Sequence, residues 1–277
     1  MEETIFKGLM IASLTLVLTA LAGMILIILI KGARALTLSM LIETPKGGYY
    51  LGKAGGIANA IVGSLYLSFS ASIIAFLLSL PMAFALQKDY SSRQFANFTR
   101  LALDVLWGIP SIVYGAFGFV VMIYFGIRAS LLGGIIVLTL LMLPIMVRSM
   151  DEVIRMIPAE LKEISYALGT TKLETTFAVI LRQALPGIVT AILLAFGRGI
   201  GDAASILFTA GYTDYIPRSL FDPVASLPLA VFFQIGTPIP EVQERAYASA
   251  LILLLIILIV CVASRLLGRR FSRKIIR

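Results

Sequence analysis

The sequence contains no histidine and a single cysteine, Cys261, in 277 residues. These absences exclude a metal centre built on histidine and cysteine, a catalytic triad or dyad that uses histidine, and a disulfide bond within the chain. Charged residues are also scarce, at 14% of the chain against about 25% in an ordinary soluble protein. Because 59% of the residues are hydrophobic, so little charge cannot solvate the surface of soluble domains of this size.

The hydrophobic residues gather in uncharged runs that are long enough to cross a bilayer, which takes about 20 residues per helix. Only helices satisfy their backbone hydrogen bonds internally over such lengths, so the sequence predicts an all-α membrane protein. Six spans are predicted, at residues 8–30, 59–85, 105–125, 131–147, 184–208 and 246–264. Four prolines are expected to bend or interrupt these spans, namely Pro81, Pro110, Pro144 and Pro186.

The first apolar run continues well past Ala20-Leu21-Ala22, which faintly resembles a signal-peptidase site, so we interpret it as a retained anchor. A net charge of +8 would suggest nucleic-acid binding in a soluble protein. Here, a topology with the N-terminus inside places more than twice as many Lys and Arg residues in cytoplasmic segments as outside. This bias predicts a multi-pass protein of the cytoplasmic membrane of a bacterium or archaeon, with both termini in the cytoplasm.

Two segments between the spans are more than connectors. The cytoplasmic segment 148–182 has mixed charge and a helical pattern. The external segment 211–245 contains an apolar stretch at 224–235 that is too short to cross, which predicts a half-helix dipping back from the outer face. No internal repeat is convincing, so the doubled architecture of many secondary transporters is not visible within this chain.

Two opposite charges lie inside the fifth predicted span. Arg198 and Asp202 are four residues apart, so on a helix they share one face. An arginine at the bilayer centre costs about 2.5–3.5 kcal/mol on insertion scales, so an arbitrary one would not persist. One interpretation is an ion pair that holds helices together; the other is a polar face lining a pathway, on which Arg198 offers a planar fork of donors to an anion.

The pair Arg198 and Asp202 has a further consequence if the anion is phosphate. Near neutral pH phosphate still carries at least one proton, whereas sulfate carries none. A carboxylate such as Asp202 can accept a hydrogen bond from that proton but repels sulfate. Our hypothesis is that Arg198 attracts the oxyanion while Asp202 competes for Arg198 and helps to release it, because a site that binds too tightly does not conduct.

The cytoplasmic segment also carries a short amphipathic helix. Pro158 suits its first turn, and Gly169 can end it. Leu161, Ile164 and Leu168 form an apolar stripe at helical spacing. The residues alone leave two interpretations open: a helix lying along the membrane surface, and a helix presented to a soluble partner.

These residues resemble a known family. Glu163-Ile164-Ser165, followed after three residues by Gly169, is similar to the EAA-x3-G loop of importer-type ABC permeases, with Ile164 and Ser165 in place of the two alanines. Further stretches resemble the permease subunits of the phosphate-specific ABC importer, in the order and spacing of its PstA type, and they lie at residues 55–63, 108–115, 198–202 and 207–209. That family usually carries Glu where this chain has Asp202.

The resemblance implies the type I ABC importer permease fold with six transmembrane helices. It implies a heterodimer with a second, PstC-type permease, two ATPase subunits, and an extracytoplasmic phosphate-binding protein on the outer loops. Glu163, Ser165 and Gly169 would then couple this chain to an ATPase. The expected division is an anchor helix and first external loop at 1–53, a five-helix core at 54–268 that includes the coupling loop 148–182, and a basic cytoplasmic tail at 269–277.

The sequence contains no Gly-x4-Gly-Lys-Ser/Thr phosphate loop, so we expect this chain to be a transport subunit rather than an enzyme. ATP and Mg are then expected on partner subunits, with no cofactor on this chain. The main expectation is ATP-driven import of inorganic phosphate by alternating access. The alternatives are an importer of another oxyanion such as molybdate or sulfate, and a carrier subunit driven by an ion gradient.

Overall fold

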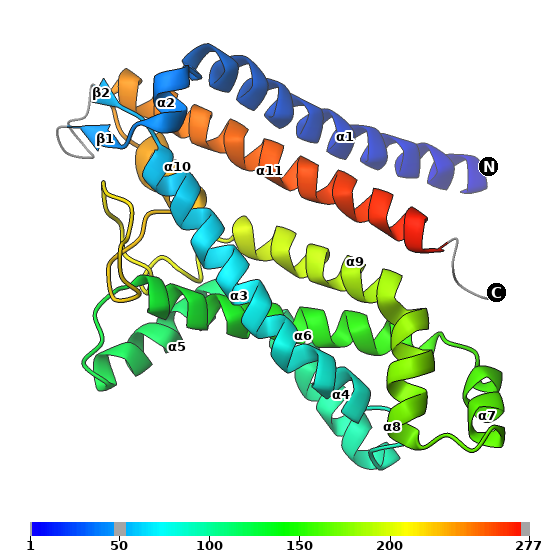
Figure 1. Cartoon of the computed structure of the whole chain (residues 1–277). Coiled ribbons are helices and arrows are strands. Elements are labelled where there is room, and N and C mark those ends of the chain that lie inside the picture. Colours follow the sequence, from blue (N-terminus) through cyan, green and yellow to red (C-terminus); the bar gives the residue numbers. More distant parts are fainter. Residues whose placement is uncertain (1, 47–53, 273–277) are drawn as a thin grey trace.

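A computed structural model describes residues 2–46 and 54–272 of the chain, and within them the protein is almost entirely helical (Figure 1). The strands are two-residue pieces, β1 (Pro45–Lys46) and β2 (Ala54–Gly55), paired antiparallel. The short helix α7 (Ala159–Ala167) lies at the opposite end of the molecule from this hairpin (Figure 1). We call the two ends the hairpin side and the α7 side. The predicted all-α architecture is confirmed.

Three long helices form the centre of the molecule: α3 (Ala58–Ala85), α6 (Leu131–Arg155) and α9 (Leu181–Ile200). One face of α6 carries large side chains every four residues that are 1% exposed or less, namely Leu138, Met142, Met146 and Met150. The buried face of α3 carries small residues at the same spacing, namely Ala71, Ala75, Ser79 and Ala83. Small residues on one helix let large side chains of the next approach closely, which is how helices pack inside membranes.

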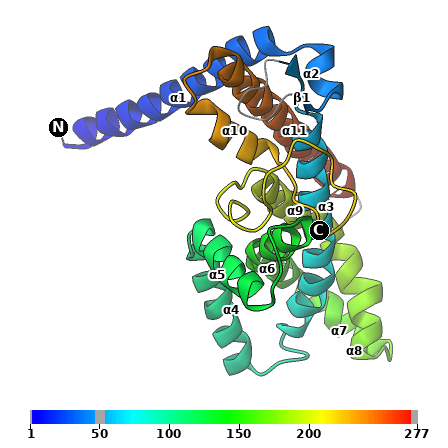
Figure 2. The same cartoon turned by 90° about the vertical axis from the view of Figure 1, so that its left-hand side faces the viewer.

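The two terminal helices are α1 (Glu2–Ala35) and α11 (Pro240–Ser272), which appear along one edge of the molecule in Figure 1. They approach each other closely at Gly32, where an added Cβ would lie 2.7 Å from the backbone oxygen of Tyr247. The apolar stretch of α1 is otherwise uncovered by the chain, and α1 splays away from the rest in the second view (Figure 2). Such a surface suits contact with lipid.

The third predicted span is not one straight helix. α4 (Arg93–Gly108) and α5 (Ser111–Tyr124) meet at an angle of 96°. Ile109 is extended because the residue before a proline avoids the helical region, and Pro110 then starts the next helix. The predicted span at 105–125 is therefore broken near its start, at the proline that was expected to bend or interrupt it. Of the four prolines expected to bend or interrupt spans, Pro110 alone separates two helices, while the other three lie within α3, α6 and α9.

The predicted short helix of the segment after α9 is present as α10 (Leu227–Ile235), capped by the Ser226 side chain. The chain leading into it crosses α3 at Gly63, where any Cβ would collide with the backbone oxygen of Ala225. The remaining short elements are α2 (Leu38–Ile42) beside the hairpin, and α8 (Lys172–Glu174) with a π-helical turn, η1 (Thr175–Ile180), before α9.

Within residues 2–46 and 54–272, five helices are long and apolar enough to cross a membrane, and the number rises to six if the bent pair α4–α5 is counted as one span. The protein is therefore a multi-pass membrane protein, as predicted. The first residues of α1 and the last residues of α11 lie on the α7 side (Figure 1). The predicted domain boundary at 53/54 and the end of the predicted basic tail fall on residues 47–53 and 273–277, outside the described residues.

Candidate functional site

Arg198 lies in the last turn of α9, on a face of the helix that no other part of the described chain covers. Thr190, Leu194 and Arg198, each one turn from the next, form an exposed stripe along this face. The neighbouring Gly197 has no heavy atom within 4 Å of the position its Cβ would take. Arg198 makes no hydrogen bond or ion pair with any described residue. Its guanidinium donors are therefore free, and its charge is favoured by the helix dipole at this end.

Asp202 does not share a helix face with Arg198. α9 ends at Ile200 with Gly201 as its cap, so the predicted continuation of the span to residue 208 was wrong. Asp202 is 8% exposed, and its Oδ1 accepts a hydrogen bond of 2.8 Å from the backbone N–H of Ser205. The carboxylate caps the turn that follows α9, and it forms no ion pair with Arg198. Glycines at 197, 199 and 201 allow the helix to end here.

The chain beyond Asp202 is fixed against α5 and α6. Gly115 of α5 lies so close to this segment that an added Cβ would be 2.7 Å from the Ser205 backbone oxygen. The first N–H groups of α6 donate to backbone oxygens of the loop, from Leu131 to Asp222 at 2.8 Å and from Leu132 to Leu220 at 2.8 Å. Because these contacts satisfy the otherwise unpaired helix terminus, they hold the loop after Arg198 in one place.

Within this loop, the carboxyl of Asp214 is influenced by the charge of Arg245 on α11. The pKa of Asp214 is raised by burial of its carboxyl, and the charge of Arg245 opposes that shift. Arg245 itself is 4% exposed. Residues 2–46 and 54–272 hold no group of three or more Cys, Asp or Glu side chains placed to bind a metal ion.

The helix predicted between Pro158 and Gly169 is present as α7. Pro158 precedes it in an extended conformation, and Gly169 ends it with φ +82°, a left-handed conformation that glycine adopts without strain. Ser165 is buried, and its hydroxyl lies 2.7 Å from the Thr170 hydroxyl and 3.0 Å from that of Thr175. Of the three residues predicted to couple to an ATPase, Ser165 therefore faces inward and ties α7 to the following turn.

The outward face of α7 is apolar and uncovered. Ile164 is 59% exposed and Leu168 is 79% exposed, and Met156, just before α7, is 82% exposed. Glu163 is exposed beside them. Two carboxylates, Glu160 and Glu163, belong to the same short helix. Exposed apolar groups rimmed by charge, at an end of the molecule away from the lipid-crossing segments, are typical of a surface that meets another protein.

The opposite face of α7 is joined to the loop that follows α3. Lys162 forms an ion pair of 3.0 Å with Asp89, and Lys172 donates at 3.0 Å to the Asp89 backbone oxygen. The pKa of Tyr166 is raised by burial and by the negative charge of Asp89. Movement of α7 would therefore pull directly on the connection between α3 and α4.

A buried ion cluster that the sequence reasoning missed lies on the same side, and we call it the Asp151 network. Asp151 is fully buried on α6 and accepts from Arg100 Nε at 2.7 Å and Arg100 Nη2 at 2.9 Å. It also accepts from Arg148 Nη1 at 3.3 Å and Gln87 Nε2 at 2.9 Å. The network thus clamps the loop after α3 and the middle of α4 onto α6. Arg148 and Asp151, three apart near the end of an apolar run, were the available signal.

Comparisons with known proteins show what this chain is similar to. The sequence model of the family "Binding-protein-dependent transport system inner membrane component" matches residues 76–277. The phosphate transport system permease protein PstA of Mycobacterium leprae is 37% identical over 206 residues, which cover 74% of this chain and 67% of that protein. PstA of Yersinia pestis is 34% identical over 220 residues, covering 79% and 74%.

A relative from Bacillus subtilis, a probable ABC transporter permease protein, is 30% identical over 271 residues and covers 92% of this chain. In three dimensions the chain is similar to a subunit of the inward-facing methionine ABC transporter MetNI, with TM-score 0.64 and 18% identity over 78% of this chain and 95% of that one. This likeness shows the type I ABC importer permease fold. The chain therefore belongs to the binding-protein-dependent transport system inner membrane components, and within them to the PstA-type permeases.

Proposed function

We propose that this chain is a permease subunit of an ATP-driven importer that moves inorganic phosphate across the cytoplasmic membrane by alternating access. The observation that carries the proposal is Arg198, a cation with free donors on an uncovered face of a membrane-spanning helix, in a chain whose relatives are named phosphate transport system permeases. Arginine suits this purpose because its planar fork matches the oxygens of phosphate.

In this mechanism Arg198 attracts the oxyanion, and Asp202 positions the chain just beyond α9 through its bond to the Ser205 N–H. Since Asp202 does not pair with Arg198, it does not compete for the guanidinium in the described conformation. Its Oδ2 is left as the acceptor for the proton that phosphate carries and sulfate lacks. Release then depends on the change of conformation rather than on exchange within an ion pair.

The energy is proposed to come from separate ATPase subunits, which carry the ATP and Mg. The sequence has no phosphate loop of its own, and the uncovered Ile164, Leu168 and Glu163 of α7 suit a groove on such a partner. Ser165 and Gly169 would hold this helix in place rather than touch the ATPase. The α7 side is then cytoplasmic, with both termini, and two ATPases serve the complete transporter.

An arginine that faces hydrocarbon is costly, so the face of α9 that carries Arg198 needs a polar cover. We propose that a second, PstC-type permease provides it, with the pathway between the two chains. The hairpin side then faces outward, and the loops between α9 and α11 receive an extracytoplasmic phosphate-binding protein. The anchor 1–53, the core 54–268 with its coupling loop 148–182, and the tail 269–277 remain our proposed division.

The test is phosphate uptake by the assembled transporter with Arg198→Ala and Arg198→Lys. Loss of a charge-assisted contact made in the pathway should lower uptake by about a hundredfold for alanine, and by less for lysine, which keeps the charge but not the fork. Arg128→Ala is the matched control, because Arg128 is an exposed arginine outside the helices. Uptake within about twofold of wild type for both Arg198 variants would refute the role of Arg198.

Competition measurements separate this function from its nearest alternative. If molybdate or sulfate is the preferred substrate, that anion will inhibit uptake of labelled phosphate at a lower concentration than unlabelled phosphate does. A carrier driven by an ion gradient would instead transport with this chain alone and would not need α7.

A further inference from the structure

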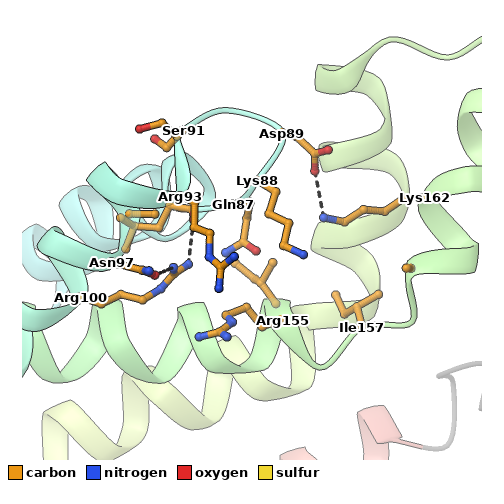
Figure 3. A pocket seen from close by; sticks show the side chains of 15 residues that line it. Gln87, Lys88, Asp89, Ser91, Arg93, Asn97, Arg100, Arg155, Ile157 and Lys162 are labelled. Atoms are coloured by element: carbon orange, nitrogen blue, oxygen red, sulfur yellow. Dashed lines mark hydrogen bonds and ion pairs between the residues drawn. The ribbon is translucent and has the colours of Figure 1, made fainter.

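A cavity of about 930 Å³ opens on the α7 side and contains none of the residues assigned above to the pathway or to ATPase coupling. The loop after α3, the first half of α4 and the junction of α6 with α7 surround it (Figure 3). Its charged lining is one-sided. A single carboxylate, Asp89, stands against five cations, namely Lys88, Arg93, Arg100, Arg155 and Lys162.

Two of these cations are already paired. Lys162 is bonded to Asp89 at 3.0 Å, and Arg100 is bonded to the buried Asp151 at 2.7 Å. Lys88, Arg93 and Arg155 make no hydrogen bond or ion pair with any described residue. Figure 3 shows their side chains directed into the space between the loop after α3, α4 and α6. Three unneutralised cations around one cavity create a strong preference for an anion with several oxygens.

The two faces of α4 indicate where this anion comes from. Arg93, Asn97 and Arg100 lie on the face that lines the cavity. Phe95, Phe98 and Leu101 lie at helical spacing on another face and are 59%, 70% and 62% exposed. An apolar face next to a cationic one is the pattern of a helix at the boundary between headgroups and acyl chains. The bend at Pro110 lets α4 differ in direction from α5.

We propose that the cavity binds the phosphate-bearing headgroup of an anionic phospholipid from the leaflet on the α7 side, with Lys88, Arg93 and Arg155 holding the phosphate oxygens. The exposed phenylalanines of α4 then contact the acyl chains of the same lipid. Free inorganic phosphate shares the headgroup chemistry, but it would leave the apolar face of α4 unexplained and much of the cavity unfilled. Because α7 closes the cavity through Lys162 and Asp89, a bound headgroup would also steady α7.

The test is native mass spectrometry of the full chain in detergent, with phosphatidylglycerol or phosphatidylcholine added in equal amounts. Wild type should retain phosphatidylglycerol in preference to phosphatidylcholine. The triple variant Lys88→Gln, Arg93→Gln, Arg155→Gln should weaken phosphatidylglycerol retention by about tenfold or more, because each basic residue near a bilayer surface adds to attraction for anionic lipid.

The matched control is Lys7→Gln, Arg182→Gln, Arg265→Gln, which removes the same charge from three exposed positions outside the cavity. We expect it to weaken retention by less than about threefold, since it changes net charge but not the site. The single variants Arg93→Gln and Arg155→Gln, each expected to weaken retention by about two- to fivefold, provide the same comparison if the triple variant does not fold.

The lipid proposal is supported if the cavity variants lose phosphatidylglycerol and the control keeps it. Equal losses in the cavity and control variants would overturn it in favour of general charge attraction. A lack of preference for phosphatidylglycerol, with saturable binding of inorganic phosphate that depends on the same three residues, would overturn it in favour of the free anion. None of these readouts involves transport, so failure here leaves the proposed function untouched.

Discussion

The arginines of this chain differ in whether their side chains have partners. Arg100 and Arg148 share the buried Asp151, and their side chains are 16% and 14% exposed. Arg198 lies on an uncovered face of α9 and has no partner among the described residues. A charge whose donors are all occupied holds helices together, whereas a charge whose donors are free is available to a ligand. The difference separates a structural role from the proposed transport role within one type of residue.

The largest effect that tests this contrast between paired and unpaired arginines is expected at Asp151. Asp151→Ala removes the shared acceptor and leaves two guanidinium groups at least partly buried without their partner, so the free energy of unfolding should fall by about 3–5 kcal/mol. The measurement is thermal unfolding of the purified chain in detergent. Asp104→Ala is the control, because Asp104 also pairs with Arg148 but is 48% exposed, and should cost about 1 kcal/mol or less. Equal effects would show that the network is not a clamp.

A smaller effect is expected on the α7 side, at Gly169. Its φ of +82° is strained for any residue with a Cβ, although no atom would obstruct one. Gly169→Ala should therefore cost about 1–2 kcal/mol locally, shift α7 and reduce co-purification of the ATPase. Gly108→Ala makes the same change at a glycine with equally open space and no positive φ, and should leave assembly unchanged. If the Gly169 variant co-purifies with the ATPase normally, binding of the ATPase does not require α7 to be held in one position.

The smallest effect on stability is expected at Arg198, and it distinguishes most clearly between paired and unpaired arginines. Arg198→Met removes a charge that contacts no described residue, so the free energy of unfolding should change by no more than about 0.5 kcal/mol. Arg100→Met, which breaks the pair with Asp151, should cost several times as much in the same assay. A large loss of stability from Arg198→Met would mean that Arg198 is also a structural residue.

Much of the fold was predictable because the membrane restricts the choices. Uncharged runs of spanning length specify helices whatever else the chain does, and α3, α6 and α11 follow the predicted spans closely. A bend or interruption at Pro110 was expected, but its size was not, because the apolar run 105–125 does not show the direction in which the chain continues before the proline. The amphipathic face of α4 begins before that run, outside the predicted spans.

The geometry around the predicted site residues could be read from the sequence only in part. The spacing of Arg198 and Asp202 implies a shared face only while the helix lasts, and the three glycines between 197 and 201 were the sign that it ends. The apolar stripe of α7 and its end at Gly169 could be predicted from the local sequence pattern. The Asp151 network joins Arg148 and Asp151 of α6, whose spacing was a local signal, to Arg100 of α4 and to Gln87 in the loop after α3, and that long-range pairing leaves no trace in a single sequence.

The central claim is that the face of α9 bearing Arg198 lines a water-filled route for phosphate. It is tested most directly by labelling Leu194→Cys, one turn from Arg198 on the same face, in a Cys261→Ser background of the assembled transporter. We predict rapid reaction with a membrane-impermeant thiol reagent and slower reaction when phosphate is present. Ile259→Cys, on an apolar face of α11, should not react. If Leu194→Cys is as unreactive as Ile259→Cys, or if phosphate has no effect, the account of Arg198 is contradicted.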